Sequence, residues 1–174
     1  SLTTALADSA REMGAKVFRH RPVTGIERTT SGAWKLSTPQ GPIVAEQVVN
    51  AAGLHAREVS QLVGHRVPVV PMERQYLVTE PLPDIGDLTQ ELPVLRDASA
   101  PLYARQEGQA MLLGLYDNEP VFWAVDGTPR DFDQTLLPSD LDRVGDTLKK
   151  AILRLPVLNE VGIKRVVNGP LLRT

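Results

Sequence analysis

Short segments of strand composition separated by turn residues constrain the fold of this chain more than any other feature. Residues 23–30, 33–38 and 42–47 form one such series, with Ser31-Gly32 and Pro39-Gln40-Gly41 between them. Glycine and proline supply the backbone conformations of tight turns, so the series predicts a three-stranded antiparallel meander. Further strands are expected at residues 17–20, 48–49, 67–70, 74–79, 92–96, 102–106, 111–116 and 161–167, the last ending before Asn168-Gly169-Pro170, and a loop is expected at 117–135.

Apolar residues at helical spacing predict three helices. The first begins near Leu2 and ends before Gly14, because glycine is favoured just past a helix C-terminus. The second covers residues 55–63. The third covers residues 139–155, with Ser139 as its expected N-cap. Its apolar positions are spaced 3, 4, 4 and 3 residues apart, at Leu141, Val144, Leu148, Ile152 and Leu155.

The composition excludes several functional classes. The chain has 174 residues, and its 19 Lys and Arg against 21 Asp and Glu give a net charge of −2. It therefore lacks the basic surface typical of nucleic-acid-binding domains. It has no cysteine, which excludes disulfides, thiolate metal sites and a cysteine nucleophile. No apolar run reaches the roughly 18 residues of a membrane span, so we expect a cytoplasmic protein that binds neither membranes nor nucleic acid.

Strong catalytic and metal-binding motifs are absent from the sequence. It contains no GxGxxG, GxxxxGK[ST], HExxH or GxSxG pattern. Its three histidines, His20, His55 and His65, are not at metal-ligand spacing, and we expect no metal site.

Two weaker features are candidate sites. Residues 50–53 (Asn-Ala-Ala-Gly) follow a short apolar run and precede a helix, so small side chains would let a ligand approach the backbone. Strand alternation places Tyr103 with Arg105 on one sheet face, and Arg74 with Tyr76 on one face of another strand. Such pairs could bind a carboxylate and an amine. Taken alone, both features have simpler interpretations, a tight strand-to-helix turn and a solvated sheet face.

Longer segments, in their order along the chain, carry a resemblance. Residues 43–80 read IVAEQVVNAAGLHAREVSQLVGHRVPVVPMERQYLVTE, residues 92–107 read LPVLRDASAPLYARQE, and NEPVFW, SDLDRV, LPVLNEVGIK and VVNGP follow. This series resembles the dimethylglycine and sarcosine dehydrogenases, the N-methylglycine branch of the D-amino-acid-oxidase-like flavoproteins. VVNAAG alone is common to many flavoproteins, but its order with RQYLVTE, LPVLRD and LYARQE is specific. The resemblance extends from Leu2 to Pro170.

The resemblance implies an α+β fold. A mostly antiparallel substrate-domain sheet with packed helices is combined with part of an FAD-binding, Rossmann-like half. Residues 1–64 are expected in the FAD-binding part and residues 65–174 in the substrate-binding sheet, including the helix at 139–155. The family's GxGxxG and its second flavin-binding segment lie outside the sequence, so the chain is expected to be a central fragment. We expect the fragment alone to lack FAD, to be inactive and to self-associate through its flavin-facing surface.

The resemblance also assigns candidate residues. Val23 corresponds to a backbone contact with the adenine end of FAD, and Ala52 and Gly53 correspond to a close-approach turn beside the cofactor. Tyr103 resembles the family's active-site tyrosine, whose hydroxyl would orient the substrate amine or accept a hydrogen bond from it. Arg74 stands where relatives generally carry histidine. A guanidinium does not release its proton in proteins, so Arg74 would bind a substrate carboxylate.

The implied reaction is oxidation of the C–N bond of an N-methylated glycine, with hydride transfer to FAD. The expected substrate is a small secondary or tertiary amino acid, with folate and an electron acceptor as further partners of the full-length protein. Two alternatives stay open: a non-catalytic ligand-binding or interaction module of the same fold, and an oxidase of another secondary amine or of a hydroxy acid.

Overall fold

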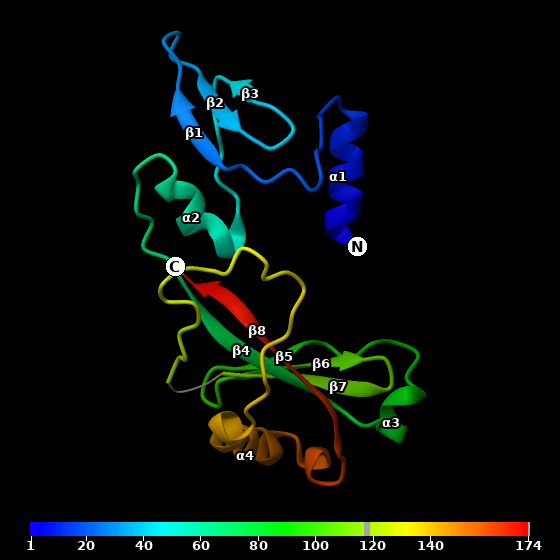
Figure 1. The fold of residues 1–174 in the computed structure, drawn as a ribbon. Coiled ribbons are helices and arrows are strands. Elements are labelled where there is room, and N and C mark those ends of the chain that lie inside the picture. The colour runs from blue at the N-terminus through cyan, green and yellow to red at the C-terminus, as the bar shows by residue number, and fades with distance from the viewer. Residues whose placement is uncertain (117–118, 174) are drawn as a thin grey trace. The chain divides into compact units, whose positions relative to one another are not determined.

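The computed structural model describes residues 1–116 and 119–173, which form two structural units (Figure 1). Unit 1 consists of Ser1–Ala52 and Ala56–Val67, and unit 2 of Gly53–His55 and Pro68–Thr174. Each unit is described below by itself. Among the described residues, every helix falls short of the length and apolar content that crossing a bilayer needs.

Unit 1 contains the meander that its turn residues predicted. Strands β1 (Gly25–Arg28), β2 (Trp34–Ser37) and β3 (Ile43–Ala45) pair antiparallel in the order β1-β2-β3. In this register Leu36 lies between Ile26 and Ile43. The expected strands at 17–20 and 48–49 are wrong, because neither segment pairs with another strand of the unit.

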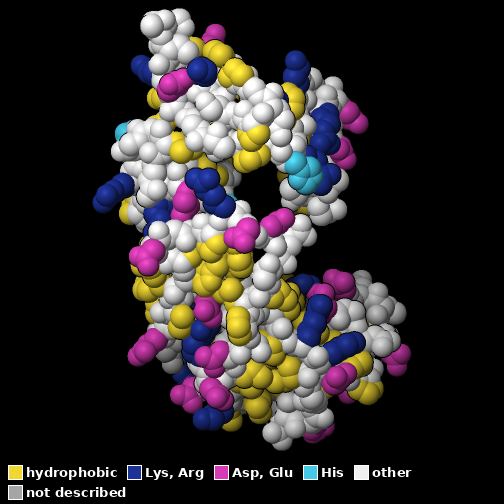
Figure 2. Space-filling view, in the orientation of Figure 1, with side chains coloured by type: hydrophobic (Ala, Val, Ile, Leu, Met, Phe, Trp, Pro, Cys, Tyr) yellow, Lys and Arg dark blue, Asp and Glu magenta, His cyan; other side chains and the backbone are white. Residues whose placement is uncertain are grey.

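The first helix of unit 1 leaves its large apolar side chains at the surface. Helix α1 (Leu2–Glu12) is capped by Ser1, whose Oγ accepts a hydrogen bond from the Thr4 N–H (3.3 Å), and it ends before Gly14, whose φ of 94° is left-handed. Helix α2 (Ala56–Gln61) follows the 3-10 turn η1 (Gly53–His55). Ser60 is the only buried residue of unit 1, so this unit has no hydrophobic core of its own. Hydrophobic side chains reach the surface of both units (Figure 2), and in unit 1 the large ones are Leu2, Leu6, Met13, Val17, Phe18, Val44 and Val49.

Unit 2 is built on a five-stranded antiparallel sheet in the order β5-β6-β7-β4-β8. The sequence had indicated separate strands at 67–70 and 74–79, but one continuous strand begins at Val70. The strands are β4 (Val70–Thr79), β5 (Leu95–Asp97), β6 (Leu102–Glu107), β7 (Ala110–Leu115) and β8 (Ile163–Arg173).

Strand β8 continues through Asn168-Gly169-Pro170, where the sequence had suggested its end. Pro170 pairs with Glu73 in the middle of the strand. Proline has no N–H for a ladder bond, so it is tolerated on edge strands. Because β8 is an edge of this sheet, the proline does not interrupt it.

One face of this sheet carries the hydrophobic core. Helix α4 (Gly145–Arg154) covers it, preceded by η2 (Asp142–Val144) and followed by η3 (Pro156–Asn159), and the short helix α3 (Pro83–Gly86) lies after β4. Burying each large apolar side chain stabilises the fold by about 1.5–3 kcal/mol. The buried core consists of Leu77, Leu82, Ala100, Leu102, Ala104, Met111, Leu113, Leu115, Val144, Ala151 and Leu158.

The last helix starts later than residue 139, the position expected from its apolar spacing. Gln75 holds the preceding segment against the sheet: its Nε2 donates to the Asp140 carbonyl, and its Oε1 accepts from the Asp140 N–H (3.1 Å). Asp140 Oδ1 in turn accepts from the Arg143 N–H (3.3 Å). The expected N-cap, Ser139, therefore lies outside the helix, and α4 begins only at Gly145.

Candidate active site

The face of the sheet opposite the core carries the predicted substrate residues. Tyr103 on β6 pairs with Gly114 on β7, and Gly114 pairs with Tyr76 on β4. Residues that are paired directly across a sheet share a face, so both tyrosines flank Gly114. Arg74 lies two residues before Tyr76 on the same strand and shares this face. We call these residues, with Tyr116, the tyrosine face.

The Tyr103 ring lies over the backbone of Gly114. A Cβ placed on Gly114 would stand 1.8 Å from Tyr103 Cε1, 2.1 Å from Cζ and 2.6 Å from Cδ1. The ring therefore reaches from β6 across β7. The hydroxyl is attached to Cζ, one of the two ring atoms nearest to that Cβ position.

Tyr116, just after β7, contacts both predicted substrate residues. Its ring centroid is 6.1 Å from that of Tyr103, with the planes inclined at 58°. The guanidinium carbon of Arg74 lies 5.4 Å from the Tyr116 ring centroid, within the range of a cation–π contact. Arg74, Tyr116 and Tyr103 thus form a continuous series on one face, and the predicted substrate residues are brought together.

Burial sets the protonation state of Tyr103. Burial of the phenol raises its pKa above the usual value, and the neighbouring Tyr116 and Tyr76 raise it further, while Arg105 acts in the opposite direction. Tyr103 therefore stays a neutral phenol at physiological pH. It can donate or accept a hydrogen bond, but it is a poor base in this form.

The predicted cofactor turn at residues 50–53 is held by Asn50. Its Nδ2 donates to the Ala56 carbonyl (2.8 Å) and to Ser60 Oγ (2.9 Å), and its Oδ1 accepts from the Ala52 N–H (3.2 Å). The Ala52 N–H is thus already used within the turn. Gly53 has a left-handed φ of 55° and open space where a side chain would stand.

Comparisons with known proteins decide the family. The model of the FAD-dependent oxidoreductase family (DAO) matches residues 1–173. The chain belongs to the FAD-dependent oxidoreductase family. It is 42% identical to mitochondrial dimethylglycine dehydrogenase of Mus musculus over 176 residues, which are 98% of this chain and 20% of that protein. It is 37% identical to mitochondrial sarcosine dehydrogenase of Homo sapiens over 172 residues, 96% of this chain and 18% of that protein.

A solved structure supports the same fold. The L-proline dehydrogenase of P. horikoshii matches 99% of this chain and 43% of its own chain, with a TM-score of 0.75 and 21% sequence identity. The α+β fold predicted from the sequence is confirmed. The chain spans about a fifth of the length of the curated relatives it matches.

The three residues predicted to contact FAD are Val23, Ala52 and Gly53, and their surroundings fit such contacts only in part. Among the described residues, the Val23 backbone forms no hydrogen bond, so its N–H and carbonyl are available to a ligand such as an adenine ring. Ala52 has a small side chain, and Gly53, which has none, has open space at its Cβ position. The Ala52 N–H does not fit a donor role, because Asn50 already accepts from it.

Sequence reasoning missed Gly114 and Tyr116, although both lie in the strand expected at 111–116. An isolated glycine inside a strand often marks a close approach of another group, and this signal could have identified Gly114. Nothing in the sequence alone identifies Tyr116 as the residue between Arg74 and Tyr103, because that relation depends on the register of three strands.

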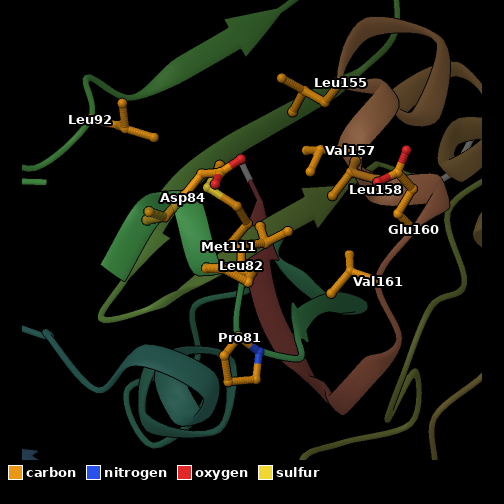
Figure 3. Close-up of a pocket in the computed structure, with 12 residues that line it drawn as sticks. Pro81, Leu82, Asp84, Leu92, Met111, Leu155, Val157, Leu158, Glu160 and Val161 are labelled. Carbon is orange, nitrogen blue, oxygen red and sulfur yellow. The ribbon is translucent and has the colours of Figure 1, made fainter. Parts of the chain in front are cut away.

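A cavity of about 530 Å³ lies elsewhere in unit 2 (Figure 3). Leu82 and Met111 face Leu158 across it, and the carboxylates of Asp84 and Glu160 are exposed beside it. Its lining is mostly apolar and includes none of the predicted site residues. An amino acid zwitterion needs a cationic partner for its carboxylate, so the tyrosine face suits such a ligand better than this cavity.

Proposed function

We propose that this chain supplies the substrate-binding part of an FAD-dependent enzyme that oxidises the C–N bond of N-methylated glycines. The observation that carries the proposal is the tyrosine face, where a cationic Arg74 and a neutral Tyr103 both contact the Tyr116 ring. The names of two relatives, a dimethylglycine and a sarcosine dehydrogenase, favour these substrates.

Arg74 binds the substrate carboxylate in this proposal. Its guanidinium keeps its charge at all relevant pH values, and charge-assisted hydrogen bonds to a carboxylate are stronger than neutral ones. Tyr116 holds the guanidinium from one side. Because Arg74 cannot accept a proton, it does not take over the proton transfer that a histidine at this position could perform.

Tyr103 orients the amine. Its oxygen accepts a hydrogen bond from an amine N–H when the substrate binds, and its raised pKa keeps the phenol proton in place. The amine proton therefore leaves to solvent before oxidation. Bound FAD would supply the hydride acceptor for the carbon next to the nitrogen, and the contribution of these residues is to orient the substrate. Val23, Ala52 and Gly53 are proposed to contact the cofactor.

A folate acceptor of the released one-carbon unit and an electron acceptor for the reduced flavin belong to the same proposal. The isolated chain is expected to be colourless, inactive and self-associating. A cytoplasmic location stays a prediction, and the two relatives named above are described as mitochondrial.

A non-catalytic module of the same fold is a second candidate, favoured by Arg74 at a position where histidine is expected. The test is the visible spectrum of the full-length protein, mixed without oxygen with sarcosine, dimethylglycine or trimethylamine. Bleaching by the two amino acids but not by trimethylamine supports the proposal. A flavin that stays oxidised with both amino acids refutes this substrate class, and a protein without flavin favours the non-catalytic module.

A further inference from the structure

The Tyr103 ring occupies the space in which residue 114 would carry a side chain. Its nearest atoms, Cε1 and Cζ, are 1.8 and 2.1 Å from the Cβ position of Gly114, far below the 3.0 Å that real Cβ atoms respect. Any side chain at residue 114 would displace the ring, because the opposing atoms belong to a half-buried aromatic group and not to a flexible chain end.

The backbone does not require glycine at this position. Gly114 is absent from the residues with left-handed φ, so an L-residue could adopt its conformation. Leu112 lies two residues earlier on the same face and carries a full side chain. Gly169, opposite Arg74 on β8, has nothing within 4 Å of its Cβ position. The steric demand for glycine at residue 114 therefore comes from the Tyr103 ring.

Tyr116 contacts both the Tyr103 ring and the Arg74 guanidinium. Its backbone is fixed at both polar groups. The Tyr116 N–H donates to the Pro101 carbonyl (3.0 Å), and Thr147 Oγ1 on α4 donates to the Tyr116 carbonyl (3.0 Å). The Tyr116 backbone, which carries the ring, is thus tied to the core helix on the opposite side of the sheet.

We infer that Gly114 and Tyr116 are positioning residues, which set the spacing between the Tyr103 hydroxyl and the Arg74 guanidinium. The importance of this spacing for catalysis rests on the proposed function. In an N-methylated glycine, one carbon separates the amine nitrogen from the carboxylate. Tyr103 and Arg74 can therefore bind both ends of one substrate only within a narrow range of separations, and errors of about 1 Å can cost on the order of 10²-fold in rate.

The first test measures the position of Tyr103 without using the reaction. Full-length flavoprotein is labelled with 3-fluorotyrosine, and the Tyr103 fluorine resonance is assigned by its loss in Tyr103→Phe and titrated with pH. Gly114→Ala should lower the Tyr103 pKa, because the displaced ring loses the burial that raises it. Among the described residues, the titratable or charged groups that act on Tyr103 or pair with it across the sheet are Tyr76, Tyr116, Arg105 and the exposed Arg96 of β5. Gly169→Ala is the matched control and should leave the Tyr103 titration unchanged.

The second test measures flavin reduction without oxygen. Gly114→Ala should slow it by on the order of 10²-fold, but it should cause no further loss in a Tyr103→Ala background, where no ring remains to be displaced. Tyr116→Leu should slow reduction, and Tyr116→Phe, which keeps both ring contacts, should restore most of the rate. These comparisons separate a positioning role from general instability. An unstable protein would lose flavin reduction rate on Gly114→Ala whether or not the Tyr103 ring is present.

An unchanged Tyr103 titration in Gly114→Ala would overturn the inference. Additive losses of Gly114→Ala and Tyr103→Ala would also overturn it. If Gly114→Ala does not fold, Tyr116→Leu against Tyr116→Phe decides alone. The proposed function fails separately, if sarcosine and dimethylglycine leave the flavin of the unmodified full-length protein oxidised.

Discussion

Asn168 offers the most stringent test of how contacts on the core side of the sheet hold the tyrosine face in place. It is 1% exposed, and its Nδ2 donates to Glu73 Oε2 (2.8 Å) and to the Pro138 carbonyl (2.7 Å). Its backbone carbonyl also accepts from the Leu137 N–H (2.9 Å). The side chain therefore fastens the segment that leads into α4, whose Thr147 holds Tyr116.

The substitution Asn168→Leu keeps a similar volume and removes both donated hydrogen bonds. Losing a hydrogen bond to a charged group costs about 1.5–3 kcal/mol, and leaving a buried carbonyl unpaired costs about 1–3 kcal/mol. Glu73 still forms its ion pair with Arg143 Nη1 (3.0 Å) in the variant. This remaining partner reduces the cost of losing the hydrogen bond from Asn168. Among the described residues, Asn168 Oδ1 has no hydrogen-bond partner, so its removal leaves no donor unpaired. We expect a net loss of about 2–4 kcal/mol.

Amide hydrogen exchange of the 136–144 segment in the full-length protein measures this loss locally. A reduction of about 2–4 kcal/mol in the opening free energy raises exchange by roughly 30- to 1,000-fold, since 1.4 kcal/mol corresponds to a factor of ten. Asn159→Leu, on an exposed residue at the end of η3, is the matched control. Exchange within about twofold of the unmodified protein would refute the view that Asn168 holds this segment.

Three further predictions follow from other contacts. Thr147→Val should lower the free energy of unfolding by about 1–3 kcal/mol, because it leaves the Tyr116 carbonyl without its donor; urea denaturation measures this, and an effect below about 0.5 kcal/mol would contradict it. Tyr103→Phe should slow flavin reduction in the full-length protein while its melting temperature stays unchanged; a lower melting temperature would instead give Tyr103 a structural role. The Asp97 pKa is lowered, first by its hydrogen bond from the Ser99 hydroxyl and then by that from Arg154. A carboxyl group whose pKa is lowered in the folded state stabilises the fold at pH values above its unfolded-state pKa, which is near 4. This stabilisation is lost as the pH falls from there through the folded-state pKa. Asp97→Asn should therefore flatten the loss of stability below pH 4, and an unchanged pH profile would contradict this.

The features that the sequence predicted well depend on local chemistry. Turn residues such as Ser31-Gly32 gave the β1–β2–β3 meander because they limit the backbone locally. Strand alternation placed Tyr103 and Arg105 on one face, and Arg74 and Tyr76 on one face, because it depends only on spacing along each strand.

The features that the sequence missed depend on partners distant in the chain. The segment 17–20 has strand composition but no neighbouring strand, and Pro170 is tolerated only because β8 is an edge. The start of α4 was misplaced because Gln75, 65 residues away, holds Asp140. The contact between Tyr103 and Gly114 requires the register of β6 against β7, which residue patterns do not give.

Arg74 offers the most direct test of the proposal that the tyrosine face binds the substrate. The measurement is the dissociation constant from anaerobic flavin reduction in full-length Arg74→Met, for sarcosine and for sarcosinamide, which lacks the carboxylate charge. We predict that sarcosine binding weakens about 10- to 150-fold, the equivalent of about 1.5–3 kcal/mol for a hydrogen bond to a charged group, while sarcosinamide binding changes little. Equal losses for both ligands, or no loss for sarcosine, would contradict the assignment of Arg74 as the carboxylate-binding residue.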